Sequence, residues 1–417
     1  MKKYLKNIFK TPMVFVFILI TIIYGFNALG MTAEINRYAI VSAIGIDSSD
    51  DEESKFEISL LTFIPIAEQT FTETYKVVSA KGKSLSEAMD FAGLHIGREV
   101  GLSHVKLIVL NEGLVHEDVT KFLDYLSRSR HMSSSTKLVI TDSTAKEFLQ
   151  VAEQLDSQSS IKVSELIAYN NEYIYATDST LETFFKGLFG PTRVSLVPYI
   201  ILEDESTSGF AVSSSGGSGN GNGGTQSKTG QAESSQEKKI VNNGDTIVFK
   251  DAVEKVKISG KDIEKINLIR GDFNTGTIDI ENFSDENFDE ANLTFEIFDK
   301  RLRNKVTYQN GIPIFQIDME LSLTLTEVEN KNGMIEENVE FFTITPEALE
   351  AIEQKVRKSV MEGVEIMRDN QIDVIDFYTI MHNSDKKSFN KFLSSLEDED
   401  NYLSHMVFKV SVKVYSK

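Results

Sequence analysis

The chain contains 417 residues, with 43 Lys and Arg against 63 Asp and Glu, so its formal net charge is −20. Such an acidic surface repels the phosphate backbone that provides most nucleic-acid affinity, which excludes nucleic acid as a partner. The absence of cysteine excludes disulfides, thiolate nucleophiles and cysteine-based metal sites, while 41% hydrophobic residues are enough for globular cores.

The N-terminus combines a basic tail with a long uncharged segment. Residues 1–10 contain four lysines and no acid, and residues 11–33 carry no charge. A helix of roughly 20 residues spans the ~30 Å hydrocarbon core of a bilayer, whereas the densest apolar part before Gly25 is nearer in length to a signal-peptide core. The segment is therefore a retained transmembrane anchor, which we favour, or a cleaved signal segment. The side chains expected in the bilayer include Met13, Phe15, Phe17, Ile20, Ile23 and Tyr24.

The lysines of the tail also predict the orientation of the chain. The positive-inside rule places the tail in the cytoplasm and everything after Gly30 on the other side of the membrane. Because the remaining body is acidic, we expect anionic headgroups to repel it, so that it does not lie on them.

Residues 34–205 alternate strand and helix signals. Helices are expected to begin at Ser84, where Glu87 completes a capping box, at His116, and at Ser143. Alternating or continuous apolar patterns predict strands at residues 38–47, 56–64, 72–82, 104–110 and 137–142. This order predicts a mixed α/β region with helices packed on a sheet, in one or two subdomains.

Residues 206–240 are dominated by Ser, Gly, Asn and Gln and contain little that could be buried. They are typical of a flexible linker or a long surface loop. Their glycines do not predict a phosphate-binding loop, because no Gly-Lys-Ser/Thr sequence follows them.

Residues 241–417 predict a separate α+β domain. Residues 246–250 form a strand pattern and residues 261–270 a short helix, and Asn310-Gly311 predicts a hairpin turn between long strands. Thr345 and Pro346 predict the start of a long amphipathic helix, and residues 406–415 a last strand. The expected fold class is therefore α+β, a multidomain mixed α/β ectodomain behind one N-terminal membrane helix.

No pattern predicts a catalytic, cofactor or metal site. The six histidines show no metal-binding spacing, and His104 is best interpreted as a structural histidine at a strand end. The acidic clusters at residues 47–53, 281–290 and 397–400 lack the elements of a calcium loop and are interpreted as solvated loops. The aromatic residues Tyr173, Tyr175, Phe184 and Phe185 are interpreted as core rather than pocket side chains.

Several segments together resemble the Ger(x)C family, the C subunits of spore germinant receptors. The resemblance begins at EINRYAIVSAIGID (Glu34–Asp47), continues through residues 101–151, and returns in the β region ending on Glu327 and in the last helices. Positions that match the family pattern are Glu34, Gly45, Asp47, His104, Glu112, Arg128, Glu327 and Phe377.

Two departures from the family pattern concern the membrane attachment and one turn. The family is typically lipidated on a cysteine, whereas Gly30 is followed here by Met31, so the uncharged segment would replace the lipid. In the family's Asp-Ile-Leu-Gly-Phe pattern, the glycine is replaced by Asp376.

The resemblance implies a three-domain, non-enzymatic ectodomain at the outer face of the spore inner membrane. It also implies that the chain works with integral-membrane A-type and B-type germinant receptor subunits that respond to nutrients. The alternative is a membrane-anchored extracytoplasmic hydrolase or solute-binding protein, for which a convergent polar pocket with paired carboxylates would be evidence.

Overall fold

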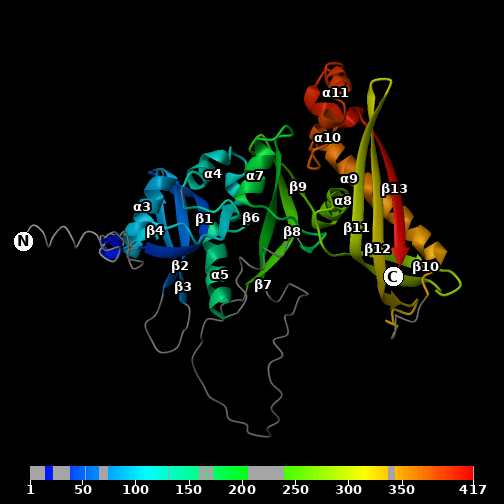
Figure 1. The fold of residues 1–417 in the computed structure, drawn as a ribbon. Coiled ribbons are helices and arrows are strands. Elements are labelled where there is room, and N and C mark those ends of the chain that lie inside the picture. Colours follow the sequence, from blue (N-terminus) through cyan, green and yellow to red (C-terminus); the bar gives the residue numbers. More distant parts are fainter. Residues whose placement is uncertain are drawn as a thin grey trace, which may run out of the picture.

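The computed structural model describes residues 15–21, 38–51, 53–64, 74–129, 131–158, 167, 172–204, 239–336 and 343–416. Within these ranges the chain forms two β-sheets with helices packed on them, in an elongated body (Figure 1). The expected α+β class is confirmed, with strands and helices in the order that the hydrophobic periodicity predicts for most of the chain.

The larger sheet has nine strands in the order β3-β2-β1-β5-β6-β7-β8-β9, with β4 paired to β1. Strands β1, β2 and β3 are antiparallel neighbours, β5, β6 and β7 continue parallel from β1, and β8 and β9 return antiparallel. The strands are β1 (Tyr38–Asp51), β2 (Ser54–Ile64), β3 (Thr74–Gly82), β4 (Glu99–Gly101), β5 (Leu107–Asn111), β6 (Lys137–Thr141), β7 (Val194–Asp204), β8 (Lys239–Lys250) and β9 (Val253–Ile258).

Helices cover both faces of this sheet. α3 (Leu85–Ile96), α4 (Thr120–Ser127) and α7 (Leu181–Leu188) bury their apolar stripes in one core, and α5 (Ala145–Gln158) buries its stripe in a second core on the other face. The predicted capping box is formed in part: Ser84 accepts from the Glu87 N–H, while the Glu87 carboxylate accepts from Lys83 N–H rather than from Ser84. The predicted second helix begins only at Thr120, because η2 (Glu112–Leu114) and a turn precede it.

The smaller sheet has the order β10-β11-β12-β13. Asn310 and Gly311 connect β11 (Ala291–Gln309) to β12 (Ile312–Glu329) with φ values of 53° and 83°, which confirms the predicted hairpin. β10 (Gly276–Phe283) pairs with β11, and β13 (Val407–Ser416) runs parallel to β12. At one end of this sheet lie α10 (Phe377–Ser384), α11 (Lys386–Leu393) and η5 (Glu399–His405).

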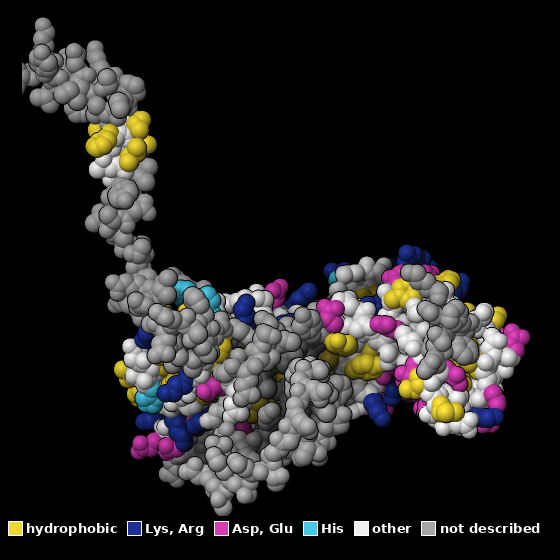
Figure 2. Space-filling model, turned by 90° about the horizontal axis from the view of Figure 1, so that it is seen from below, with side chains coloured by type: hydrophobic (Ala, Val, Ile, Leu, Met, Phe, Trp, Pro, Cys, Tyr) yellow, Lys and Arg dark blue, Asp and Glu magenta, His cyan; other side chains and the backbone are white. Residues whose placement is uncertain are grey.

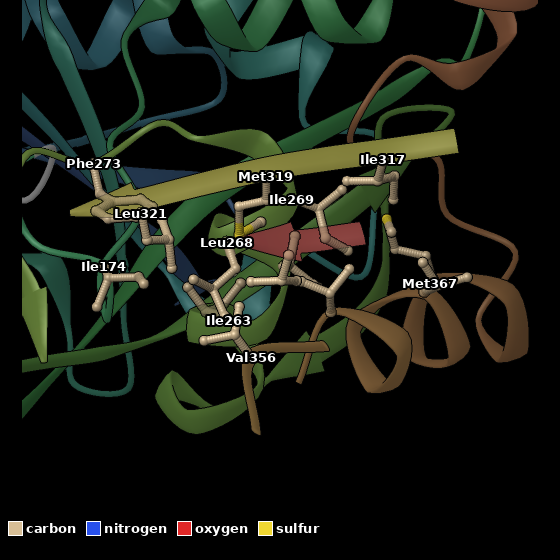
Figure 3. Close-up of a cluster of buried hydrophobic side chains, with 14 of the residues drawn as sticks. Ile174, Ile263, Leu268, Ile269, Phe273, Ile317, Met319, Leu321, Val356 and Met367 are labelled. Atoms are coloured by element: carbon tan, nitrogen blue, oxygen red, sulfur yellow. The ribbon is translucent and has the colours of Figure 1, made fainter. Parts of the chain in front are cut away.

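The long helix α9 (Pro346–Asp369) packs on one face of the smaller sheet together with α8 (Gly260–Arg270). Thr345 accepts a hydrogen bond from Ala348 N–H, and Pro346 occupies the first turn, as predicted. Figure 3 shows side chains of both helices, including Ile263, Leu268 and Val356, meeting Met319 and Leu321 of β12. Burial of this stripe against the sheet fixes the position of α9.

The Ser- and Gly-rich segment joins two neighbouring strands of the same sheet. Asp204 at the end of β7 is paired with Lys239 at the start of β8, and the segment between them lies outside the described residues. The predicted domain boundary at residues 240 and 241 falls inside β8. Strands β8 and β9, assigned from sequence to the C-terminal domain, instead extend the larger sheet, because β8 pairs with β7 and β9 pairs with β8.

The predicted membrane segment is described only at residues 15–21, which are helical. Among its expected bilayer side chains, Phe15, Phe17 and Ile20 are 73%, 72% and 54% exposed, and Figure 2 shows this apolar band clear of the body. Met13, Ile23 and Tyr24 lie outside the described residues. In the part of the chain that the structure describes, no helix has the length and hydropathy needed to cross a bilayer, so the membrane helix stays a prediction.

Candidate functional site

Asp47 joins the N-terminal strand to a helix that follows 98 residues later. From within β1 its carboxylate accepts hydrogen bonds from the backbone N–H groups of Ala145 at 2.6 Å and Lys146 at 3.0 Å, the first residues of α5. The side chain is 5% exposed, and this burial raises the pKa of Asp47 although the two N–H groups act in the opposite direction. An anionic cap at a helix N-terminus is electrostatically favourable, so Asp47 fixes α5 on the sheet.

Gly45 explains how α5 approaches the sheet so closely. A Cβ atom at this position would lie 3.0 Å from the Ala145 Cβ and 3.1 Å from the Ala145 carbonyl oxygen. A side chain here would therefore displace the start of α5 and separate Asp47 from its two donors.

A second buried carboxylate, Asp373, organises the turn after α9. It is 4% exposed and accepts hydrogen bonds from Phe377 N–H and Tyr378 N–H, each at 2.9 Å, and from the Tyr402 hydroxyl at 2.5 Å. Burial raises the pKa of Asp373, and burial beside this carboxylate also raises the pKa of Tyr402. Asp373 thus connects the N-terminus of α10 to η5.

The neighbouring Asp376 and Phe377 complete this turn. Asp376 is the N-cap of α10 and adopts a left-handed conformation, with φ 63° and ψ 42°. Phe377 is fully buried, with its ring centroid 4.5 Å from that of Phe315 and 5.3 Å from that of Phe408. Since glycine adopts positive φ without steric cost, the backbone accounts for the family's glycine at the position of Asp376.

Polar contacts join the larger sheet to the C-terminal elements. The Arg193 Nη2 atom donates to both carboxylate oxygens of Asp400, at 2.8 and 2.7 Å, while its Nη1 atom lies 3.0 Å from Asp251. Lys250 Nζ donates to the Gln371 carbonyl at 3.2 Å. Several residues at this junction, namely Arg193, Asp251, Ala252, Gln371 and Asp376, have positive φ values, which concentrates backbone strain there.

A cavity of about 420 Å³ lies at the same junction. Its charged lining residues are Asp178, Lys186, Arg270, Asp373 and Asp376. Asp178 is paired with Lys137 Nζ at 2.6 Å, Asp373 holds its three donors, and Asp376 accepts from Thr379 N–H at 3.3 Å. The carboxylates of this cavity are therefore engaged in structural contacts.

The described residues contain no group of three or more His, Asp or Glu side chains arranged to hold a metal ion. His104, expected at a strand end, is exposed in a turn before β5, which begins only at Leu107. His116 contacts Glu254 at 3.0 Å, and the His95 ring contacts the Ser79 carbonyl at 3.1 Å. None of the described histidines lines the cavity.

Comparison with known proteins identifies the family. Residues 32–202 match the "Spore germination protein N-terminal domain", and residues 244–416 match "Spore germination B3/ GerAC like, C-terminal". The two matches follow one another in order and leave out the Ser- and Gly-rich segment. The chain belongs to the GerAC family of spore germination proteins.

One curated relative of this GerAC-family chain is "Spore germination protein KC" of Bacillus subtilis (strain 168), 24% identical over 182 residues. That alignment covers 41% of this chain and 45% of the relative, so the chain spans less than half the length of the curated relative it matches. Among solved structures, "Crystal Structure of the GerBC protein" is similar at 14% identity and a TM-score of 0.48, covering 89% of this chain and 96% of that chain.

The positions that carry the family resemblance are distributed over both sheets. Gly45 and Asp47 form the contact with α5, and Phe377 lies in the turn organised by Asp373. Glu112 accepts from the Tyr199 hydroxyl at 2.6 Å, and Lys257 Nζ lies 3.3 Å from the centroid of the Tyr199 ring. Of the remaining positions, His104, Arg128 and Glu327 are exposed, and Glu34 lies outside the described residues.

The structure therefore places Gly45 and Asp47 at one helix-capping site and Phe377 at another, and it does not bring the predicted positions together in one pocket. Sequence reasoning missed Asp373, Tyr402 and Arg193. Asp373 could have been found as the first residue of the Asp-Ile-Leu-Gly-Phe pattern, four residues before Phe377. Arg193 carries no local signal, because its partner Asp400 is 207 residues away.

Proposed function

We propose that this chain is the C subunit of a nutrient germinant receptor in spores. Residues 11–33 tether it to the spore inner membrane, its body lies on the outer, extracytoplasmic face, and it works with integral-membrane A-type and B-type subunits. It acts as a scaffold or signalling component that germination requires, and it is not an enzyme.

The observation that carries this proposal is the ordered match of both GerAC regions across the chain. The uncharged residues 11–33 behind a basic tail support the tether, because they supply the apolar length that the missing cysteine-linked lipid would provide. A tether confines the body near its partners and raises their effective concentration, so that weak contacts suffice for assembly.

The side chains that line the cavity at the junction support the proposal that the chain is not an enzyme. A hydrolase of the two-carboxylate type needs one carboxyl group to act as acid and another as base or nucleophile. Here Asp178 is paired with a lysine and Asp373 accepts three hydrogen bonds. This engagement supports a non-catalytic role for the carboxylates of the cavity.

Co-purification of the full-length chain from spore inner membranes tests the proposal. Detergent extracts should contain the chain together with polytopic subunits, and a variant lacking residues 11–33 should lose its partners and any membrane association that persists at 0.5 M NaCl. An N-terminal epitope tag retained on the mature chain would support the anchor over the cleaved signal. Recovery of the full-length chain as a lone species in the soluble fraction would contradict the tether and the complex.

The alternative function, a membrane-anchored solute-binding protein or hydrolase, rests on the same cavity of about 420 Å³, which is large enough for a small polar molecule. Binding of a solute there would raise the melting temperature of the chain, and Arg270→Met would remove this shift. Turnover of a substrate by the purified chain would favour the hydrolase over the receptor subunit.

A further inference from the structure

The four-stranded sheet has one face covered by α9 and an opposite face whose polar side chains are open to solvent. We call three neighbouring rows of side chains on this open surface the basic sheet face. On β11 and β13 its basic side chains are exposed, while the acidic side chains of β12 between them are only half-buried. The basic sheet face consists of Arg301, Arg303 and Lys305 on β11, Gln316, Asp318 and Glu320 on β12, and Lys409, Ser411 and Lys413 on β13.

The strand register arranges these side chains in three rows across the sheet. Arg301 lies opposite Glu320, which lies opposite Lys413. The next two rows are Arg303, Asp318 and Ser411, and Lys305, Gln316 and Lys409. Neighbouring side chains on one face of a sheet interact directly, so the rows form one continuous charged surface.

Five cations against two acids make these three rows positive on a chain whose net charge is −20, and the exposed Asp299 in the adjoining row adds a third acid. None of the five forms an ion pair with another residue in the described part of the chain. Arg301, Arg303 and Lys413 surround a shallow hollow of about 230 Å³ with Asp318 and Glu320 among its lining residues. Because Arg and Lys side chains are longer than those of Asp and Glu, the outermost charges of the face are positive.

The composition of the face indicates the kind of partner. Specific protein interfaces centre on buried apolar or aromatic anchors and are depleted of charged residues at their core, whereas the three rows contain only charged and polar side chains. A flat surface of unpaired Lys and Arg instead fits a surface of closely spaced negative groups, such as anionic phospholipid headgroups. Nucleic acid would have to approach an acidic molecule whose body, in the proposed orientation, lies on the side of the membrane away from the cytoplasm.

We propose that the basic sheet face docks on the anionic headgroups of the membrane to which the chain is tethered. This inference rests on the proposed function, because the tether is what holds the face near the membrane. The charge that binds the headgroups comes from the face alone. β1, where the described body begins, and the four-stranded sheet lie at opposite ends of the molecule (Figure 1), so a second contact at this sheet would lay the body along the bilayer.

The acidic body does not prevent this contact. Screening limits electrostatic interactions to about 8 Å at physiological ionic strength, so a headgroup against the face is influenced mainly by the five cations. Each cation near an anionic surface strengthens binding roughly fivefold. The headgroup repulsion expected from net charge therefore applies to the remainder of the surface and not to this face.

The absence of cysteine allows a direct test with the full chain in liposomes. Ser411→Cys places one fluorophore on the face, and Lys358→Cys places a matched fluorophore on α9, where the lysine side chain is 79% exposed. The liposomes carry a headgroup-attached quencher and contain phosphatidylcholine alone or with phosphatidylglycerol. With phosphatidylglycerol we expect at least threefold more quenching at position 411 than at position 358, and equal quenching without it or at 0.5 M NaCl.

Two triple variants separate the local face from the overall charge. The face variant carries Arg301→Glu, Arg303→Glu and Lys413→Glu, and its matched control carries Lys55→Glu, Lys81→Glu and Lys387→Glu at exposed positions elsewhere. Both variants have the same net charge, and circular dichroism verifies their folding. Quenching at position 411 should fall to the level of position 358 in the face variant and persist in the control.

Equal quenching at the two positions in phosphatidylglycerol liposomes, or equal loss in both triple variants, would overturn the proposal. An acidic protein partner would be indicated if poly-L-glutamate shielded position 411 from an aqueous quencher while anionic liposomes did not. Flotation with phosphatidylcholine liposomes reports the tether separately. A chain that fails to float with them contradicts the tether, while its recruitment by phosphatidylglycerol liposomes still tests the face.

Discussion

The two ends of the molecule use the same chemical device over different distances. In the larger sheet, Asp47 caps a helix that begins 98 residues further along the chain. In the C-terminal region, Asp373 caps a helix only four residues away and adds the hydroxyl of Tyr402, 29 residues on. The first contact fixes tertiary structure, since it attaches α5 to the sheet, whereas the second fixes a turn. We therefore expect removal of the Asp47 carboxylate to loosen α5 from the sheet, and removal of the Asp373 carboxylate to destabilise the turn before α10.

Asp373→Ala should have the largest effect. It leaves two backbone N–H groups and the Tyr402 hydroxyl without their acceptor in a site that is 4% exposed. Buried unsatisfied groups cost about 1–3 kcal/mol each, so we expect a loss of about 4 kcal/mol in the free energy of unfolding, measured with urea. Tyr402→Phe, which removes only one donor, should cost about 1 kcal/mol. Equal losses for the two variants would mean that the carboxylate is not the centre of this contact.

Asp47→Ala should cost about 2 kcal/mol, the upper range for loss of a helix N-cap. The reason for the smaller value is that only the Ala145 and Lys146 N–H groups lose their acceptor. Asp47→Asn keeps one acceptor oxygen and should recover about half of the loss. Hydrogen exchange resolves the location: the first turn of α5 should exchange faster in Asp47→Ala, and α10 should be unaffected. Faster exchange in both helices would contradict two independent sites.

These two sites also show what the sequence can reveal. The capping residues Ser84 and Thr345, the Asn310-Gly311 hairpin and the stripe of α9 were predictable, because each signal lies within a few residues. The pairing of β8 with β7 was not predictable. The register of two strands separated by 34 residues depends on the core that they share, to which Val194 and Val248 contribute. For the same reason Asp47 was recognised only as a family position, and its role as the cap of α5 needed the fold.

Asp376 allows a finer test within the C-terminal turn. A left-handed conformation costs a residue with a Cβ atom about 1 kcal/mol relative to glycine, and the Asp376 side chain offsets part of this by accepting from Thr379 N–H. Asp376→Ala keeps the strain and loses the hydrogen bond, so it should destabilise by about 1 kcal/mol. Asp376→Gly loses the bond but removes the strain and should be within about 0.5 kcal/mol of the wild type. If alanine and glycine behave alike in thermal unfolding, the backbone conformation is not the reason for the family's glycine.

The smallest effect concerns the pH dependence of buried and exposed caps. Burial raises the pKa of Asp373, so its stabilising contribution is complete below the unfolded pKa of about 4 and is lost as pH rises through its folded pKa. Asp385, the exposed N-cap of α11, has a pKa lowered by the Ser388 hydroxyl, so its contribution is present above about pH 4 and is lost as pH falls through its folded pKa. The difference in unfolding free energy between the wild type and Asp373→Asn should therefore shrink from pH 4 to pH 7, while the difference for Asp385→Asn should stay nearly level over that range and shrink as pH falls below 4. Parallel profiles for the two variants would show that burial does not set the sign of the titration at these caps.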